Sequence, residues 1–454
     1  MTGSRLNTTD RPARHIVIVG AGFGGLAAAC ALGKRGVPVT LIDRQNHHLF
    51  QPLLYQVATA ALSPADIAAP IRAIVKRFPS VRVLMDEVTG VDHTSHIVRT
   101  ANGADIPYDA LIIATGAQHS YFGNDQWSAY APGIKTIDDA IRVRRDILVA
   151  MERAETMRQE DPASRSKPIV FAVIGGGPTG VEMAGAIAEL TRHAAAMDFK
   201  HISPTCVRVL LIEGSDRLLA AFSPESSAAA LKSLGELGVE VMLSHRVTAI
   251  DANGVTANGE LIPTAANIWA AGVQASPAAK WLGVTPDRSG RVPVDAQLRV
   301  VDRPDIFVLG DTAAQRDATG KAVPGIAPAA KQQGLHVASF IAAKIAGKRE
   351  PRPFRYNDAG VLATIGRRRA VIDLPKMRLN GFVAWLLWST VHLYFLVGFR
   401  NRFIVGLTWL WNYVTFERGV RLITAGAVSS PGDDPTRERA GNEVTSASLA
   451  PIPA

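Results

Sequence analysis

The stretch that decides the fold is His15-Ile-Val-Ile-Val-Gly20-Ala-Gly22-Phe-Gly-Gly25. A short apolar run that leads into a glycine turn predicts a buried parallel strand, and the Ala-rich residues 26–34 predict the helix that follows it. The first glycine allows a tight turn, the second lets the backbone approach a pyrophosphate, and the third lets helix and strand pack closely. A second apolar run, 39–43, ends at Asp43, where a carboxylate can accept a hydrogen bond from a ribose hydroxyl. The stretch therefore predicts a dinucleotide site rather than a glycine-rich structural turn.

The same pattern returns 155 residues later. Residues 168–174 predict a strand, Gly175-Gly-Gly177-Pro-Thr-Gly180 its turn, and 181–193 the helix. A repeated strand, turn and helix indicates two nucleotide-binding domains of α/β type, not one domain with a chance match.

The acid of this second unit is Glu213, at the end of the apolar run 207–212. It lies 33 residues after Gly180, and we interpret the extra length as an insertion around residues 198–205. A carboxylate at this place repels a 2′-phosphate, so NADH is expected over NADPH. The alternative is a helix-capping or solvated glutamate.

Two dinucleotide sites in one chain imply electron transfer between a bound flavin and a diffusible nicotinamide. Asp311 follows the apolar run 305–309, which places its carboxylate to bond the ribityl chain of a flavin. Glu182 lies two residues after Gly180. It either stabilises the helix through the helix dipole or lies where nicotinamide and flavin meet, where it can relay a proton.

Composition narrows the class of protein further. The chain has 454 residues, a formal net charge of +9 and a mean hydropathy of +0.12, so it is basic and rather apolar. Its basic residues are spread along the chain without a recognisable motif, so we expect no nucleic-acid partner. Its two cysteines form no C-x-x-C pair, and the adjacent His47 and His48 lack a third nearby ligand, so no metal site is expected. The polar residues 1–14 predict a disordered arm without a signal peptide.

The C-terminal part changes character after about residue 379. Residues 382–399 carry no formal charge, Arg400-Asn-Arg402 interrupts, and 403–416 is apolar and aromatic again. We interpret these residues as a helical pair that lies on a membrane surface, with a buried helical hairpin or a dimer interface as the alternative. The run Arg367-Arg-Arg369 is interpreted as a lipid-headgroup contact or a solvated turn, and 429–454 as a disordered tail.

Taken together, the motifs resemble those of type II NADH dehydrogenases, the single-subunit NADH:quinone oxidoreductases that pump no protons. The stretches that carry this resemblance are Val39-Thr-Leu-Ile-Asp-Arg44, His48-Leu-Phe-Gln-Pro-Leu-Leu-Tyr-Gln-Val-Ala58, Ala114-Thr-Gly116, Gly175-Gly-Gly-Pro-Thr-Gly-Val-Glu182, Trp269-Ala-Ala-Gly-Val273, Leu309-Gly-Asp311 and Ala327-Pro-Ala-Ala-Lys-Gln-Gln-Gly334.

The resemblance implies a fold of two Rossmann-type domains with a C-terminal amphipathic helical membrane-anchoring region. The implied boundaries are 15–120 and 290–350 for the FAD-binding domain, 121–289 for the NADH-binding domain, and 351–428 for the membrane-associating region. FAD would be held by Gly20, Gly22, Gly25, Asp43, Thr115 and Asp311, and NADH by Gly175, Gly177, Gly180 and Glu213. The catalytic residues would be Glu182, near the nicotinamide, and Gln332, beside flavin and quinone. The family's lysine near the flavin has no counterpart in 382–399, where Trp388 and His392 are the candidates.

The activity that the resemblance implies is hydride transfer from NADH to FAD, followed by transfer of two electrons to a membrane quinone. The expected partners are that quinone, the surface of the lipid bilayer and a second copy of the chain in a homodimer. The expected location is the cytoplasmic face of the inner membrane, as a peripheral protein. A soluble flavin reductase of a protein partner and a redox-sensing flavoprotein are the alternatives.

Overall fold

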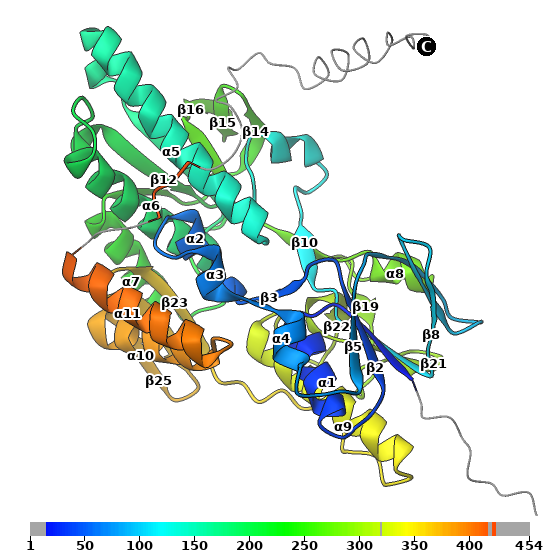
Figure 1. The fold of residues 1–454 in the computed structure, drawn as a ribbon. Helices are drawn as coiled ribbons and strands as arrows, with labels where there is room; N and C mark the ends of the chain where they lie inside the picture. The colour runs from blue at the N-terminus through cyan, green and yellow to red at the C-terminus, as the bar shows by residue number, and fades with distance from the viewer. Residues whose placement is uncertain (1–14, 318–319, 416–419, 424–454) are drawn as a thin grey trace, which may run out of the picture. The chain divides into compact units, whose positions relative to one another are not determined.

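The computed structural model of this chain describes residues 15–317, 320–415 and 420–423 (Figure 1). The expected arm 1–14 and tail 429–454 lie outside the described residues.

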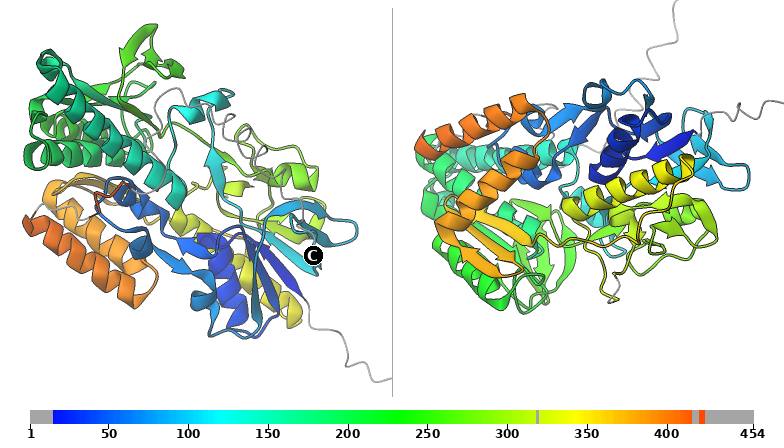
Figure 2. Two further views of the ribbon diagram at one scale, coloured as in Figure 1. Left: turned by 45° about the horizontal axis from the view of Figure 1, so that its top comes forward. Right: turned by 90° about the horizontal axis from the view of Figure 1, so that it is seen from below.

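The first βαβ unit builds the centre of a six-stranded sheet, in the order β20-β21-β9-β1-β2-β5. Its strands are β1 (Ile16–Val19), β2 (Val39–Asp43), β5 (Val81–Met85), β9 (Ala110–Ile113), β20 (Arg299–Val300) and β21 (Arg303–Val308). β1 pairs in parallel with β2 and β9, and all four residues of β1 are buried, as expected for a strand covered on both faces. β21 joins next to β9, so this sheet is made of two distant parts of the chain. Two helices, α1 (Phe23–Gly33) and α9 (Ala327–Ile345), pack against each other beside it (Figure 2).

The second unit forms a four-stranded parallel sheet in the order β13-β12-β11-β17. Its strands are β11 (Ile169–Ile174), β12 (Val207–Ile212), β13 (Val239–Met242) and β17 (Ala266–Trp269). The helices around it are α5 (Ile137–Glu160), α6 (Pro178–Met197) and α7 (Pro224–Glu236). The long spacing between Gly180 and Glu213 comes mostly from a longer helix, because α6 has 20 residues whereas α1 has 11. The predicted insertion around residues 198–205 therefore accounts for only a smaller part of it.

The remaining short elements connect or flank these sheets. They are β3 (His47–Leu49), α2 (Leu54–Ala58), α3 (Pro64–Ile67), β4 (Ala68–Pro70), α4 (Ile71–Val75), β6 (Val88–Asp92), β7 (Ile97–Thr100), β8 (Asp105–Pro107), β10 (Ala117–His119), β14 (Val247–Asp251), β15 (Gly254–Ala257), β16 (Glu260–Pro263), β18 (Val273–Ala275), α8 (Ala278–Leu282), β19 (Val292–Pro293) and β22 (Ala313–Ala314). β10 and β18 form a two-stranded antiparallel ladder of their own.

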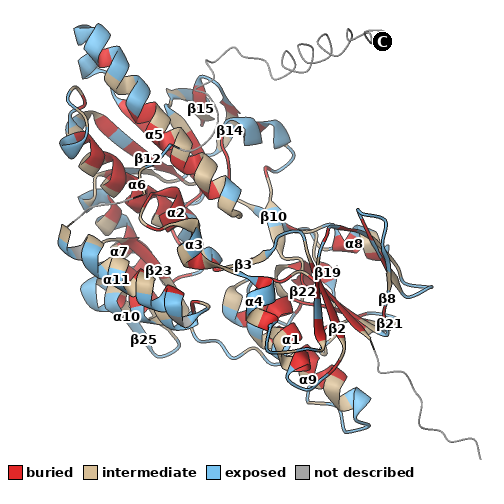
Figure 3. Cartoon of the chain, in the orientation of Figure 1, coloured by how far each residue is buried: buried red, intermediate tan, exposed pale blue. Residues whose placement is uncertain are grey.

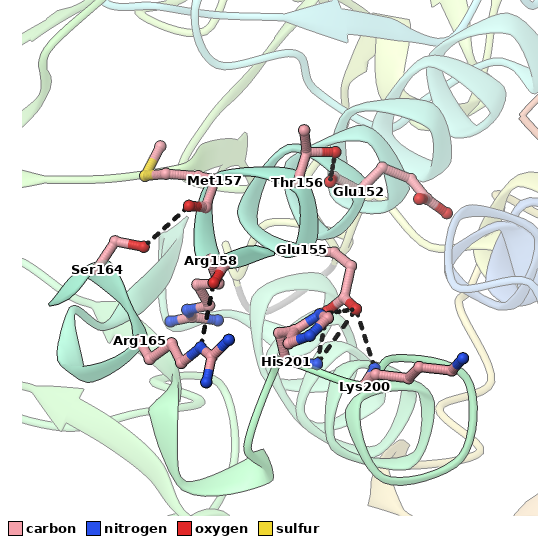
Figure 4. Close-up of polar contacts among 9 residues, drawn as sticks. All are labelled: Glu152, Glu155, Thr156, Met157, Arg158, Ser164, Arg165, Lys200 and His201. Carbon is pink, nitrogen blue, oxygen red and sulfur yellow. Dashed lines mark hydrogen bonds and ion pairs between the residues drawn. The ribbon is translucent and has the colours of Figure 1, made fainter. Parts of the chain in front are cut away.

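The charged helix α5 is fastened near its end to the segment that follows α6 (Figure 4). Glu155 accepts hydrogen bonds from the backbone N–H groups of Lys200 and His201, and its Oε1 lies 2.8 Å from His201 Nδ1. Burial would raise the pKa of Glu155, but these hydrogen bonds outweigh it and lower that pKa. The carboxylate therefore stays ionised and fixes the way in which the chain enters β12.

The C-terminal region begins with a sheet that is not predicted from the sequence. Its strands are β23 (Val361–Gly366), β24 (Arg369–Leu374) and β25 (Met377–Asn380), joined as an antiparallel meander. β23 packs on α6, and β24 packs on α7.

β24 holds α7 at both of its ends. Asp373 accepts hydrogen bonds from the backbone N–H of Ser223 at 2.6 Å and from the hydroxyl of Ser226 at 2.5 Å, at the N-terminus of the helix. Arg369 donates to the carbonyl of Ser233 at 3.1 Å and to Glu236 at 2.5 Å, near the C-terminus. An acid at the N-terminus and a base at the C-terminus both match the helix dipole. Arg369 therefore binds the second domain, in contrast to the predicted lipid-headgroup contact of the arginine run.

Two helices complete the C-terminal region, α10 (Gly381–Phe395) and α11 (Phe399–Thr415). The predicted break at residues 400–402 is wrong, because the chain turns at residues 396–398, where Gly398 has a φ of +90° that suits glycine. Within the described residues, none of the helices is both long and apolar enough to cross a bilayer.

These two helices are buried on one side only (Figure 3). Ala384, Trp388, Leu396 and Val405 belong to the same buried cluster as residues of α5, α6 and β11. Their opposite side, which we call the outer face, exposes Phe382, Val383, Leu386, Tyr394, Phe395, Phe403, Leu407, Leu410, Trp411 and Val414.

Candidate functional site

The acids of the two repeated units make the same contact. Asp43 Oδ2 accepts a hydrogen bond of 2.6 Å from Ala21 N, and Glu213 Oε2 accepts one of 2.5 Å from Gly176 N. In both cases the donor is the residue directly after the first glycine of the turn. Each carboxylate therefore lies beside its glycine turn, as required to bond the ribose of a dinucleotide whose pyrophosphate occupies that turn.

Glu213 is held in its charged form. Burial would raise its pKa, but hydrogen bonds from Ser215 and from the backbone of Gly176 and Gly214 outweigh that effect and lower the pKa. An ionised carboxylate accepts a hydrogen bond from a 2′-hydroxyl and repels a 2′-phosphate, which agrees with the expected preference for NADH.

The glycines divide into two structural roles. A β-carbon at Gly25 would lie 1.8 Å from Gly20 O, and one at Gly180 would lie 1.7 Å from Gly175 O, so both positions allow no side chain. A β-carbon at Gly22 or Gly177 would meet nothing within 4 Å.

Gly22 and Gly177 are also the N-cap residues of α1 and α6, and neither helix has a side-chain cap hydrogen bond. Both helices therefore present uncapped backbone N–H groups and open space, which fits the pyrophosphate of a dinucleotide such as FAD or NADH.

A group of hydroxyls lies where β9, β18 and β21 end. Thr115 Oγ1 lies 2.5 Å from Ser276 Oγ and 3.3 Å from Thr312 Oγ1, so the structure brings Thr115 next to the Gly310-Asp311 turn. The roles of Thr115 and Asp311 in holding FAD stay predictions. Lys135, which no sequence motif indicates, comes from the segment before α5. Burial lowers the pKa of Lys135, and the charge of Asp311 opposes that shift.

Glu182 lies in the wall of a cavity of about 830 Å³. The cavity is lined by Tyr55, Gln56, Thr59, Ala61, Glu182, Ala186, Ala188, Glu189, Arg192, His193, Glu236, Leu237, residues 364–369, Trp385, Trp388, Ser389, Trp409 and Asn412. Burial raises the pKa of Glu182 to about 8, although a hydrogen bond from the backbone of Thr364 lowers it in part. A carboxyl with this pKa is mostly protonated at pH 7 and can give up a proton near neutral pH.

Three tryptophans of α10 and α11 also line the cavity, Trp385, Trp388 and Trp409. Trp388 is only 2% exposed, and its Nε1 has no hydrogen-bond partner among the described residues. Trp409, whose ring lies 5.6 Å from that of Trp388, instead donates to Gln56 Oε1 at 2.8 Å. Since a buried donor is normally satisfied, the indole N–H of Trp388 is an exceptional group in the wall of this cavity.

His392 supports Trp388 and contributes no charge. The two rings are stacked with centroids 4.0 Å apart. Burial lowers the pKa of His392 to about 4, against the effect of its hydrogen bond to Trp388 O, so the ring is neutral at pH 7.

Gln332 lies outside this cavity lining. Its amide exchanges two hydrogen bonds with the backbone of Asn357, at 3.0 and 2.9 Å. The neighbouring Gln333 is buried, accepts from Gly310 N at 2.7 Å and donates to Gln315 Oε1 at 2.7 Å. Gln333 therefore fixes the turn before Asp311, and its adjacency to Gln332 in the sequence was the only signal for it. The role of Gln332 beside flavin and quinone stays a prediction.

One residue of the histidine pair, His48, contacts the first glycine turn. His48 is buried and bonds Ala21 O through Nδ1 at 2.8 Å. In the part of the chain that the structure describes, we find no group of three or more His, Cys, Asp or Glu side chains that could hold a metal ion.

Comparisons with known proteins agree with this arrangement. A family model described as pyridine nucleotide-disulphide oxidoreductase matches residues 14–334, and one described as NDH2 C-terminal domain matches residues 359–417. The chain is 42% identical over 432 residues to the type II NADH:quinone oxidoreductase Ndh of Mycobacterium tuberculosis, which covers 92% of each chain. The chain belongs to the type II NADH:quinone oxidoreductases.

Two further matches extend this result. NdhA, the second type II NADH:quinone oxidoreductase of M. tuberculosis, is 42% identical over 430 residues, covering 91% of this chain and 90% of its own. Among solved structures, NDH2 from Plasmodium falciparum in complex with NADH superposes with a TM-score of 0.82 over 91% of this chain and 100% of that chain. At 22% identity this match shows the fold alone. The resemblance and the α/β fold class predicted from the sequence are confirmed.

Proposed function

We propose that this chain oxidises NADH through a bound FAD and reduces a membrane quinone, without pumping protons. The main support for the proposal is that each of the two glycine turns has a carboxylate beside it, Asp43 in one and Glu213 in the other. In addition, Glu182, which can hold a proton at neutral pH, lines the cavity. FAD, when bound, accepts a hydride from NADH and passes two electrons on to the quinone.

The chain's own residues bind and orient the two dinucleotides. In this proposal Gly20, Gly22, Gly25, Asp43, Thr115 and Asp311 hold FAD, and Gly175, Gly177, Gly180 and Glu213 hold NADH. The uncapped helix N-termini at Gly22 and Gly177 support this assignment, as do the two carboxylates beside their turns.

The cavity between α6 and the α10–α11 pair is our proposed quinone site. Its wall offers an unpartnered N–H from Trp388 for a quinone carbonyl, and Glu182 provides one of the two protons that the quinone takes up when it is reduced to the quinol. A role of Gln332 in this step is proposed from the resemblance only, since Gln332 bonds Asn357 outside the cavity lining.

The outer face of α10 and α11 is the proposed contact with the lipid bilayer. A row of exposed apolar and aromatic side chains on two adjoining helices is typical of a surface that enters the lipid interface. Arg402 lies within 5.9 Å of the Tyr394 ring on this face, and such cations favour anionic headgroups.

We propose a peripheral position on the cytoplasmic face of the inner membrane, where such a contact would let one enzyme reach both water-soluble NADH and a quinone dissolved in lipid. We also propose a homodimer, in which a second copy would cover part of the exposed apolar surface. Light scattering in a mild detergent distinguishes a monomer from a dimer.

The test uses the visible spectrum of the purified holoenzyme. Anaerobic NADH should bleach the flavin, and a quinone analogue should restore its colour through many cycles. A redox sensor would be reduced once and stall, and a reductase of a protein partner would not be reoxidised by the quinone. Either of these outcomes would reject the proposed quinone reductase.

A further inference from the structure

Phe122 is an exposed aromatic residue in an unfavourable backbone conformation. Its φ is +54°, in the left-handed region that penalises residues with a β-carbon, and the residue is 66% exposed. A ring this exposed gains little free energy from burial that could offset the strain in the backbone. Strained residues of this kind persist where the surrounding structure fixes them, often at binding sites.

The surrounding structure fixes the Phe122 ring against the segment that follows β17. A β-carbon at Gly272 would come within 2.5 Å of Phe122 Cζ, so the ring lies directly on that glycine. The ring is also 6.0 Å from that of Trp269, in an edge-on arrangement. Trp269 in turn donates from Nε1 to Ser120 O at 3.0 Å, and Ser120 N donates to Gly272 O at 3.2 Å. Two hydrogen bonds therefore hold the two segments together beside the ring.

The segment that contacts the ring adjoins the second glycine turn. β17 and β11 are parallel neighbours with Trp269 opposite Ile174, so residues 270–272 lie beside the Gly175 turn at the carboxyl edge of the sheet. A β-carbon at Gly175 would approach Ala271 Cα to 2.6 Å, which shows how close the two segments are. Glu213, the proposed adenosine-ribose partner, lies on the other side of β11, at the end of β12.

The order along the edge is thus Glu213, the Gly175 turn, residues 270–272 and Phe122. A dinucleotide with its adenosine ribose at Glu213 and its pyrophosphate at the turn extends its nicotinamide half toward residues 270–272. We propose that Phe122 is an aromatic wall for the nicotinamide half of NADH. This inference rests on the proposed NADH site and adds the residue that distinguishes the nicotinamide half from the adenosine half.

The test compares two ligands on the flavin-loaded enzyme. NAD⁺ carries both halves of the dinucleotide, and its binding is followed by the change in flavin absorbance. ADP carries the adenosine half only, and its binding is measured as competitive inhibition with respect to NADH. Phe122→Gly removes the ring and suits the left-handed backbone, so the thermal midpoint should stay equal or rise. NAD⁺ should bind at least fivefold more weakly to this variant, while ADP binding stays unchanged.

Two controls separate the explanations. Phe122→Tyr keeps an aromatic ring and should keep NAD⁺ affinity, and Tyr130→Ala removes another exposed aromatic of the same segment, which should leave both ligands unaffected. Unchanged NAD⁺ affinity in Phe122→Gly, or equal weakening of NAD⁺ and ADP, would overturn the inference. Glu213→Gln tests the underlying site, because it should weaken both ligands. If it weakens neither, the proposed NADH site itself is wrong.

Discussion

Replacing Trp388 by phenylalanine tests the assignment of the cavity, because Trp388 Nε1 is a buried donor without a partner among the described residues. An unsatisfied buried donor costs about 1–3 kcal/mol, and the substitution removes that cost. The ring area that is lost costs about 1–2 kcal/mol. The two terms nearly cancel, so we expect the thermal midpoint of Trp388→Phe to stay close to that of the parent.

Trp409 provides the matched control. Its N–H donates to Gln56 Oε1, so Trp409→Phe loses ring area and also leaves an acceptor unpaired in the cavity wall. Since Trp409 is only partly buried, the two losses together amount to about 1–3 kcal/mol, and the thermal midpoint should fall.

For the quinone KM we expect the reverse order, with the larger change in Trp388→Phe. Trp388→Phe loses a hydrogen bond to the quinone worth about 0.5–1.5 kcal/mol, which corresponds to a KM about two- to tenfold higher for a short-chain quinone analogue. The rate of flavin reduction by NADH, measured by stopped flow, should not change. If Trp388→Phe leaves the quinone KM unchanged, or slows the NADH step equally, the indole does not face the quinone and our assignment of the cavity fails.

Four further outcomes follow from the site and its surroundings. Quinone reduction should decline as pH rises through about 8, where Glu182 loses its proton, and Glu182→Gln should abolish that decline. Because the pKa of Glu182 is raised in the folded state, the parent should also lose stability relative to this variant as pH rises from about 4.5 to 8, which thermal scans would reveal. Glu213→Ala should narrow the preference for NADH over NADPH about tenfold, and an unchanged ratio of kcat/KM values would remove Glu213 from the site. Gln332→Ala should slow quinone reduction more than flavin reduction, whereas equal slowing in stopped-flow traces would exclude a quinone contact. Asp373→Asn should destabilise the protein by about 1 kcal/mol at neutral pH. Burial raises the pKa of Asp373, but hydrogen bonds from Ser223 and Ser226 outweigh burial and lower it. The greater stability of the parent over this variant should therefore vanish as pH falls below about 4.

Local patterns predicted the two nucleotide-binding units well, because each glycine turn, helix and acid obeys short-range geometric rules. Asp43 and Glu213 lie beside the turns that the spacing implied, and β21 extends the first sheet as an apolar strand should. The helix boundaries in the C-terminal part were less predictable, since the first helix of the pair ends at Phe395 and the chain turns at residues 396–398, before the charged residues 400–402.

Contacts between distant parts of the chain could not be read from the sequence. The β23–β25 meander is stabilised by α6 and α7, which lie more than 120 positions earlier in the chain, and its short strands carry no distinctive pattern of their own. The cavity combines residues of α2, α6, α7 and the two last helices, so only folding identifies Trp388 as unpartnered and Gln56 as the partner of Trp409.

Because Ala384, Trp388, Leu396 and Val405 complete a buried cluster with α5 and α6, the last two helices cannot be treated as a detachable anchor. Truncation before α10 would strip side chains from the interior of the catalytic body, and the resulting loss of membrane binding would be indistinguishable from misfolding. A water-soluble form of the enzyme is better sought by exchanging outward-pointing residues such as Leu410, Trp411 and Val414 for polar ones, which leaves the inner side of the helix pair in place.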